Sequence, residues 1–112
     1  MNPNELIDFL RNNVIEKNLE LYKMLLDTTK EATDETWKGI LPIYNSLNEV
    51  QKSNFIKFLR LVEVNTLSHV LGILDGVSST KDLKDELILI SNSTEEKING
   101  ELQDIFLESE EN

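Results

Sequence analysis

Hydrophobic residues recur with a helical period over the first third of the chain. They form two successive stripes: Ile7, Leu10 and Val14, followed by Ile15, Leu19, Tyr22 and Leu26. Asn2 is a suitable N-cap for this segment, with Pro3 in the first turn. The stripe shifts at residues 11–14 (RNNV), where two asparagines weaken a helix. The pattern therefore predicts a bent helix, or two helices, over residues 2–33.

The pattern is interrupted at residues 34–49 (DETWKGILPIYNSLNE). Asp34 can cap a short turn, Gly39 can end it, and Pro42 is expected to exclude a continuous helix. We expect the apolar residues of this segment, Trp37 among them, to cover the core. An exposed aromatic contact surface is the alternative.

The longest apolar pattern, at residues 46–76, predicts a central helix. Ser46 and Glu49 match a capping box, and Asp75–Gly76 resembles a helix end with Gly76 in the left-handed conformation. On a helical wheel the apolar residues fill two adjoining arcs. The main arc holds Phe55, Leu59, Val62, Thr66, Val70 and Ile73, and the second holds Ile56, Leu67, Leu71 and Leu74. So wide a surface indicates a helix packed on more than one side, running unbroken to Leu74 or restarting at Ser53–Asn54.

A β-type pattern follows near the C-terminus. Residues 86–91 (ELILIS) favour a strand that pairs with residues 96–99 (EKIN), before a short helix at residues 101–108. A helix throughout is the alternative. A lone hairpin is marginal in water, so this one must pack on the helices or pair with a second chain. The predicted fold class is mostly α: one small domain over residues 1–112, with a long central helix and a minor two-stranded β element.

Charge changes the picture more than any motif. The chain has 21 acidic and 11 basic residues, for a net charge of −10. Such a chain repels nucleic acid and anionic membranes, so we expect neither as a partner. A basic protein is the expected partner, and Asp82, Asp85 and Glu86 are the expected contact residues. The alternative is that the acidity only keeps the protein soluble.

The chain's only histidine, His69, lies at the end of the most apolar stretch. Asn65, one turn earlier, can hydrogen-bond to it and fix its tautomer. We expect a partly buried structural histidine, with a binding contact or a catalytic base as alternatives. Gly72 weakens a helix, so we expect another helix or the hairpin to approach it closely. Asp75 opposes the helix dipole and is therefore expected to have its own partner, such as a lysine or another protein.

Glu63 lies between the two apolar arcs. A carboxylate there needs a partner if it is buried, and Arg60, one turn earlier, is the expected one. A glutamate of raised pKa acting as a base is the alternative. No metal site or cofactor is expected, because the chain has no cysteine, one histidine and no phosphate-binding loop.

The leading functional hypothesis is a non-enzymatic protein-binding module, such as an inhibitor or immunity-type protein that neutralises a basic partner. Small size, acidity and the absence of a catalytic motif favour it. The first alternative is a small enzyme with a polar site around Glu63, Asn65 and His69. The second is a homodimer or higher homo-oligomer that completes its core across a symmetry axis. No apolar run reaches the ~20 residues of a membrane span, and the N-terminus lacks the features of a signal peptide. We therefore expect a cytoplasmic protein.

Overall fold

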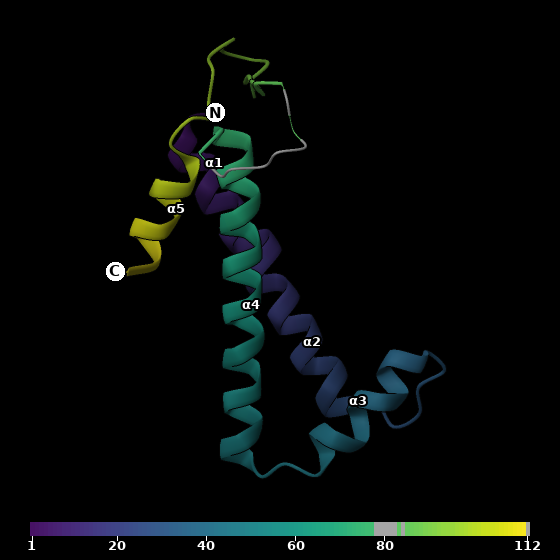
Figure 1. The fold of residues 1–112 in the computed structure, drawn as a ribbon. Helices are drawn as coiled ribbons and strands as arrows, with labels where there is room; N and C mark the ends of the chain where they lie inside the picture. The colour runs from purple at the N-terminus through teal and green to yellow at the C-terminus, as the bar shows by residue number, and fades with distance from the viewer. Residues whose placement is uncertain (78–82, 84, 112) are drawn as a thin grey trace.

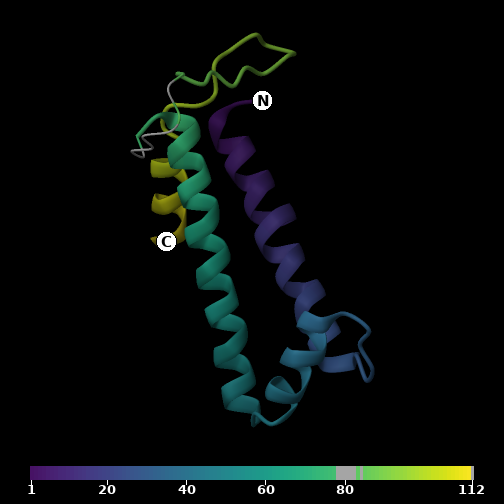
Figure 2. The ribbon, with the colours of Figure 1, turned by 45° about the vertical axis from the view of Figure 1, so that its right-hand side comes forward.

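Two long antiparallel helical arms dominate the structure. A computed structural model describes residues 1–77, 83 and 85–111. The first arm is continuous through α1 (Pro3–Leu10), η1 (Arg11–Glu16) and α2 (Lys17–Thr28). The second arm is α4 (Glu49–Asp75), which α3 (Glu35–Asn45) joins to the first arm at one end (Figure 1). At the other end α5 (Leu102–Glu111) packs beside α4, as Figure 2 also shows. The prediction of a mostly α fold is confirmed.

The shift between the two stripes of the first arm has a definite cause. η1 is a π-helix, in which the Lys17 amide donates to the Asn12 carbonyl five residues earlier. One extra residue is thereby accommodated in the turn, which brings the buried residues Ile7 and Ile15, about 80° apart on an ordinary α-helix, closer to one line along the arm. The arm therefore stays continuous where a bend or a break was expected.

α3 extends further than the sequence suggests. Asp34 caps it as expected, accepting a hydrogen bond from the Trp37 amide at 3.0 Å. The expectations that Gly39 ends the helix and that Pro42 excludes it are both wrong. Pro42 is exposed, so the bond that it cannot make lies at the surface, where water can replace it. Burial of Leu41 and Tyr44 on the other side of α3 compensates.

α4 is unbroken, as one of the two predictions for it required. It begins with a capping box of Asn48 and Gln51, not of Ser46 and Glu49, and Gly76 ends it with a φ of +76°. The helical wheel ranked the wrong arc of α4 as the main buried face. The buried face follows the second arc, through Leu71, whereas several residues of the main arc face solvent. Those exposed are Val62, Thr66 and Val70.

The C-terminal segment contains no β-strand among the described residues. Residues 85–101 are extended or turning, and an isolated antiparallel bridge joins Ile90 to Lys97. Ile98 is buried, and the Asn99 side chain donates to the carbonyls of Leu74 and Leu87. Asn99 thereby ties this segment to the end of α4, and the predicted minor β element amounts to this one bridge.

The core is divided between the two ends of an elongated molecule. A larger cluster joins the first arm to α4 and α5, and its buried members are Ile7, Ile15, Leu19, Val64, Leu71, Leu102 and Phe106. A smaller cluster of Leu26, Leu41 and Tyr44 holds α3. The molecule measures 49 × 31 × 26 Å. None of the helices in the described ranges is long and apolar enough to cross a membrane.

Candidate functional site

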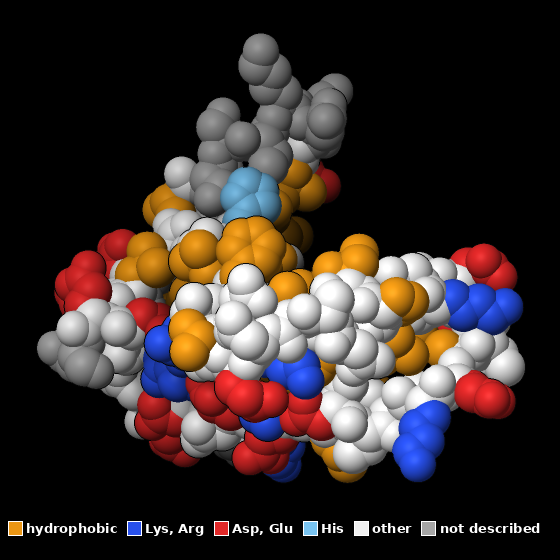
Figure 3. All heavy atoms as spheres, turned by 90° about the horizontal axis from the view of Figure 1, so that it is seen from below, with side chains coloured by type: hydrophobic (Ala, Val, Ile, Leu, Met, Phe, Trp, Pro, Cys, Tyr) orange, Lys and Arg blue, Asp and Glu red, His pale blue; other side chains and the backbone are white. Residues whose placement is uncertain are grey.

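Asn65 and His69 lie on the exposed side of α4. Both residues are exposed, and no hydrogen bond joins them in the part of the chain that the structure describes. Phe58 and Leu61, on the same side of the helix, are 60% and 53% exposed. Figure 3 shows the histidine side chain at the surface, beside hydrophobic side chains. The expectation of a partly buried histidine is wrong, because α4 turns its other arc to the core.

Asp75 has a partner inside the molecule. Its Oδ1 accepts a hydrogen bond from the Gly100 amide at 2.6 Å, and its Oδ2 accepts one from the Gln103 amide at 2.8 Å. The carboxylate thus caps the N-terminus of α5, where negative charge is favourable. The expected partner, a lysine or another protein, is replaced by the backbone of α5. This places Asp75 in the structural frame.

Gly72 is buried on α4, and the expected close approach of another element to it stays a prediction. One turn before it, Ser68 is also buried and receives the Gln103 side chain of α5 on its carbonyl oxygen at 3.0 Å. The side of α4 that meets α5 therefore carries small residues.

The three expected contact residues lie in or near the segment that precedes α5. Asp82 lies outside the described residues. Asp85 and Glu86 are exposed, and Glu86 makes one long ion pair with Lys97 at 3.9 Å. An ion pair that is this long and exposed contributes little to stability. The carboxylates of Asp85 and Glu86 are therefore available to a partner.

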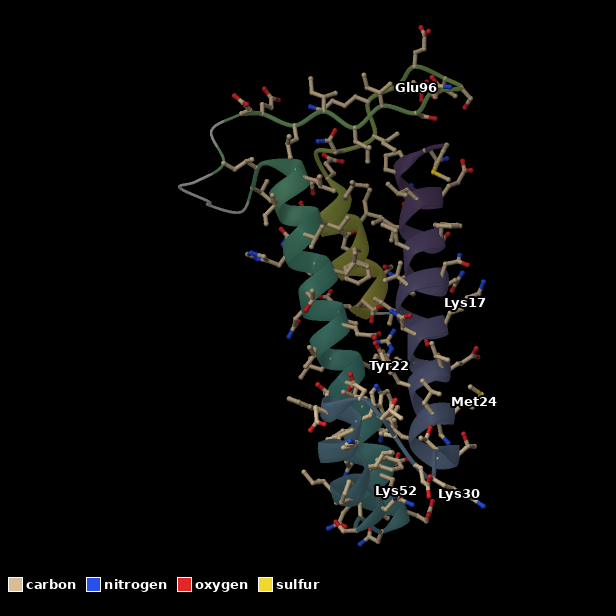
Figure 4. All side chains as sticks on the ribbon, turned by 90° about the vertical axis from the view of Figure 1, so that its right-hand side faces the viewer. Lys17, Tyr22, Met24, Lys30, Lys52 and Glu96 are labelled. Carbon is tan, nitrogen blue, oxygen red and sulfur yellow. The ribbon has the colours of Figure 1, made fainter. Side chains whose placement is uncertain are left out.

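Most of the net negative charge is carried by the segment that contains Asp85 and Glu86. Residues 85–111 contain nine of the 21 acidic residues and one of the 11 basic residues, and so carry a net charge of −8 out of −10. Figure 4 shows Glu96 at one end of the molecule and Lys30 and Lys52 at the other. We call residues 85–111 the acidic end.

An exposed aliphatic strip runs through the acidic end at residues 87–90. Leu87 and Leu89 are 37% and 36% exposed, and Ile88 and Ile90 are 60% and 55% exposed. Side chains of an extended segment point alternately to opposite faces, and the face that packs on a core is normally buried. In this strip the side chains of both faces are exposed, which is unusual.

The backbone of the strip has one open edge. The Leu89 carbonyl accepts from the Ile98 amide at 2.9 Å, and the Leu89 amide donates to the Asn99 side chain at 2.8 Å. In an antiparallel pair, alternate residues direct their backbone groups to opposite sides. The amides and carbonyls of Ile88 and Ile90 therefore face away from residues 96–99, and no described residue bonds to them.

Glu63 has no ion pair with Arg60, contrary to expectation. Arg60 instead donates to Glu16 of η1 at 2.9 Å and to Glu110 of α5 at 2.8 Å. One Glu63 carboxylate oxygen, Oε2, is buried without a hydrogen-bond partner among the described residues. Burial, and then the charge of Glu16, raise the pKa of Glu63, and Arg60 opposes them.

The Arg60 cluster fastens α5 to both arms. Glu110 also accepts from Arg11 Nε at 2.8 Å, and Arg11 stacks over the Phe106 ring with 5.4 Å to its centroid. The hydrogen bond from Arg60, reinforced by the one from Arg11, lowers the pKa of Glu110 against the opposing effect of burial. Because Arg11 and Glu16 are five residues apart, an α-helix would hold them about 140° apart, whereas the π-turn stacks them on one face.

Glu63 lines an apolar pocket between α2, α3 and α4, with a volume of about 370 Å³. The pocket does not include Asn65 or His69, which stand on another side of α4. Glu63 and His69, six residues apart, are separated by about 120° around the helix axis. The structure thus does not bring the three residues of the alternative enzyme site together. The role of Tyr22 and Trp37 in this pocket was missed, because residues so distant in sequence carry no shared signal.

Within the described residues, no three His, Cys, Asp or Glu side chains are grouped so that they could hold a metal ion. No family model, curated protein or solved structure was found to match the chain. Its function is therefore inferred from its own residues and their geometry.

Proposed function

We propose that the protein is a non-enzymatic binding module that recognises a basic protein through its acidic end, as an inhibitor or immunity-type protein would. The observation that carries this proposal is the open edge at Ile88 and Ile90, which lies inside a segment of net charge −8. An apolar centre surrounded by charged residues is the usual composition of a protein interface.

The edge suggests how the partner is held. Ile88 and Ile90 offer their outward-facing amides and carbonyls to an extended segment of another protein, as in recognition by strand addition. The surrounding carboxylates favour a segment rich in lysine or arginine and accelerate its approach. A second copy of this chain fits the edge poorly, since antiparallel pairing would bring two acidic ends together.

The proposal is tested by isolating the partner from the native host with the tagged protein and measuring association at low and physiological salt. We expect a basic partner whose on-rate falls as salt rises, because charges are screened beyond ~8 Å at physiological ionic strength. Asp85→Lys with Glu86→Lys should slow association. The control pair, Glu20→Lys with Glu31→Lys, makes the same charge change at exposed positions outside the acidic end and should have less effect.

A second variant tests the edge separately from the charge. Ile88→Pro removes an outward-facing amide that has no internal partner, so it should weaken binding and leave the melting temperature nearly unchanged. An acidic or neutral partner, or an on-rate indifferent to salt, contradicts the proposal. So does turnover of a small-molecule substrate that is lost in His69→Ala, which would favour the enzyme alternative.

A further inference from the structure

The pocket beside Glu63 has the make-up of a small-ligand site. Its volume of about 370 Å³ lies within the range of ~300–1,000 Å³ typical of such sites. Tyr22 and Trp37 stack on one wall with ring centroids 6.2 Å apart and an interplanar angle of 27°. Figure 4 shows Tyr22 reaching from α2 toward α4. The remaining apolar lining residues are Leu26, Ile40, Phe55, Leu59 and Val62.

Among the described residues that line the pocket, Glu63 is the only charged one. Its buried Oε2 has no hydrogen-bond donor among the described residues, although buried polar atoms in native proteins almost always have one. The nearest expected cation, Arg60, is engaged by Glu16 and Glu110. The Glu63 side chain thus lines the cavity, and its carboxylate keeps one acceptor without a donor while the local arginine is committed elsewhere.

We propose that this pocket binds a small organic cation: an ammonium group on Glu63, carried by an aromatic or branched aliphatic body that packs against Trp37 and Leu59. The ammonium supplies the missing donor through a charge-assisted hydrogen bond at a mostly apolar site. The aromatic wall adds attraction for the cation and buries the body of the ligand. Anions are disfavoured by Glu63. None of the residues that line this pocket belongs to the acidic end, and the site does not depend on the proposed protein partner.

Three matched probes test the chemistry: tryptamine as the cation, tryptophol as its neutral isostere and indole-3-propionate as the anion. Binding to the 112-residue protein is followed by amide shifts in ¹⁵N-labelled samples and by calorimetry. We expect tryptamine to shift amides of residues lining the pocket and to bind roughly tenfold or more tightly than tryptophol, the effect of one charged hydrogen bond. Indole-3-propionate should not bind there.

Variants separate the charge from the apolar pocket. Glu63→Gln should weaken tryptamine roughly tenfold and leave tryptophol unchanged, whereas Trp37→Leu should weaken both. Glu20→Gln, an exposed carboxylate on α2, is the matched control and should change neither. A melting curve for each variant verifies folding. Equal affinity for tryptamine and tryptophol, unchanged tryptamine affinity in Glu63→Gln, or no pocket shifts with tryptamine, benzylamine and cyclohexylamine would overturn the proposal.

Discussion

Glu63 is ionised in the folded protein only against the cost of burying its charge. Because its pKa is raised above the ordinary value of 4.5, it favours the folded state below that pH, and this contribution is lost as pH rises through the raised pKa. Glu63→Gln should therefore raise the melting temperature at pH 7, with a gain that shrinks toward pH 4. Thermal melts at both pH values, with Glu20→Gln alongside, measure this. A lower melting temperature at pH 7 would mean that ionised Glu63 stabilises the fold.

Tyr44 anchors the smaller core cluster through one hydrogen bond. Its hydroxyl donates to Asp27 Oδ1 at 2.6 Å, and burial followed by this bond raises the pKa of Tyr44 to about 12. Tyr44→Phe keeps the ring, with its edge contact to Phe55, and removes only that donor. We expect a loss of about 1 kcal/mol in urea unfolding, since Asp27 retains Lys23 and contact with water. An unchanged midpoint would show that water replaces the hydroxyl at no cost.

At the same scale, His69 illustrates where sequence reasoning fails. A wheel ranks the faces of a helix by apolarity, but α4 carries apolar residues on more sides than its neighbours cover. Which arc becomes buried is decided by where α5 and the first arm lie, and no local pattern encodes that. Because His69 is exposed, His69→Ala should change the free energy of unfolding by less than about 0.5 kcal/mol.

At the scale of elements, α5 depends on ionic contacts for its place. Glu110 has a lowered pKa, so its contribution is complete above its ordinary value of 4.5 and is lost as pH falls through the lowered pKa. Glu110→Gln should destabilise the protein by roughly 2 kcal/mol at pH 7 and accelerate hydrogen exchange in α5. The difference from wild type should vanish in strong acid. Its exposed neighbour is the control, and Glu111→Gln should behave as wild type.

The ends of helices were predictable where they depend on a few adjacent residues. Features that depend on contacts between distant residues were much less predictable. The end of α4 at Gly76 and the cap of α3 at Asp34 were both expected, because each depends on a few adjacent residues. The length of α3 was not, since tertiary burial of Leu41 and Tyr44 outweighs the local cost of Pro42. The Arg60–Glu110 pair joins residues fifty positions apart, which a single sequence cannot reveal.

At the scale of the whole molecule, the protein is elongated and its net charge is unevenly distributed along its length. The radius of gyration of 17.6 Å exceeds the about 13 Å of a compact chain of this length. Small-angle scattering from the monomer should return the larger value, and a result near 13 Å would contradict the open arrangement of the arms. With most of the net charge at one end, the molecule should also orient in the field of a basic partner before contact.

The π-turn of η1 has a consequence for the history of the gene. The fold does not need the extra residue of this turn. Removing one asparagine would leave Ile7 and the former Ile15 seven residues apart, which places them on the same face of an ordinary α-helix. Arg11 and the former Glu16 would then stand four apart, still on one face. Deletion of the single codon for Asn12 or Asn13 should therefore leave the fold unchanged. Homologous genes that differ there by one codon should encode the same arrangement of helices.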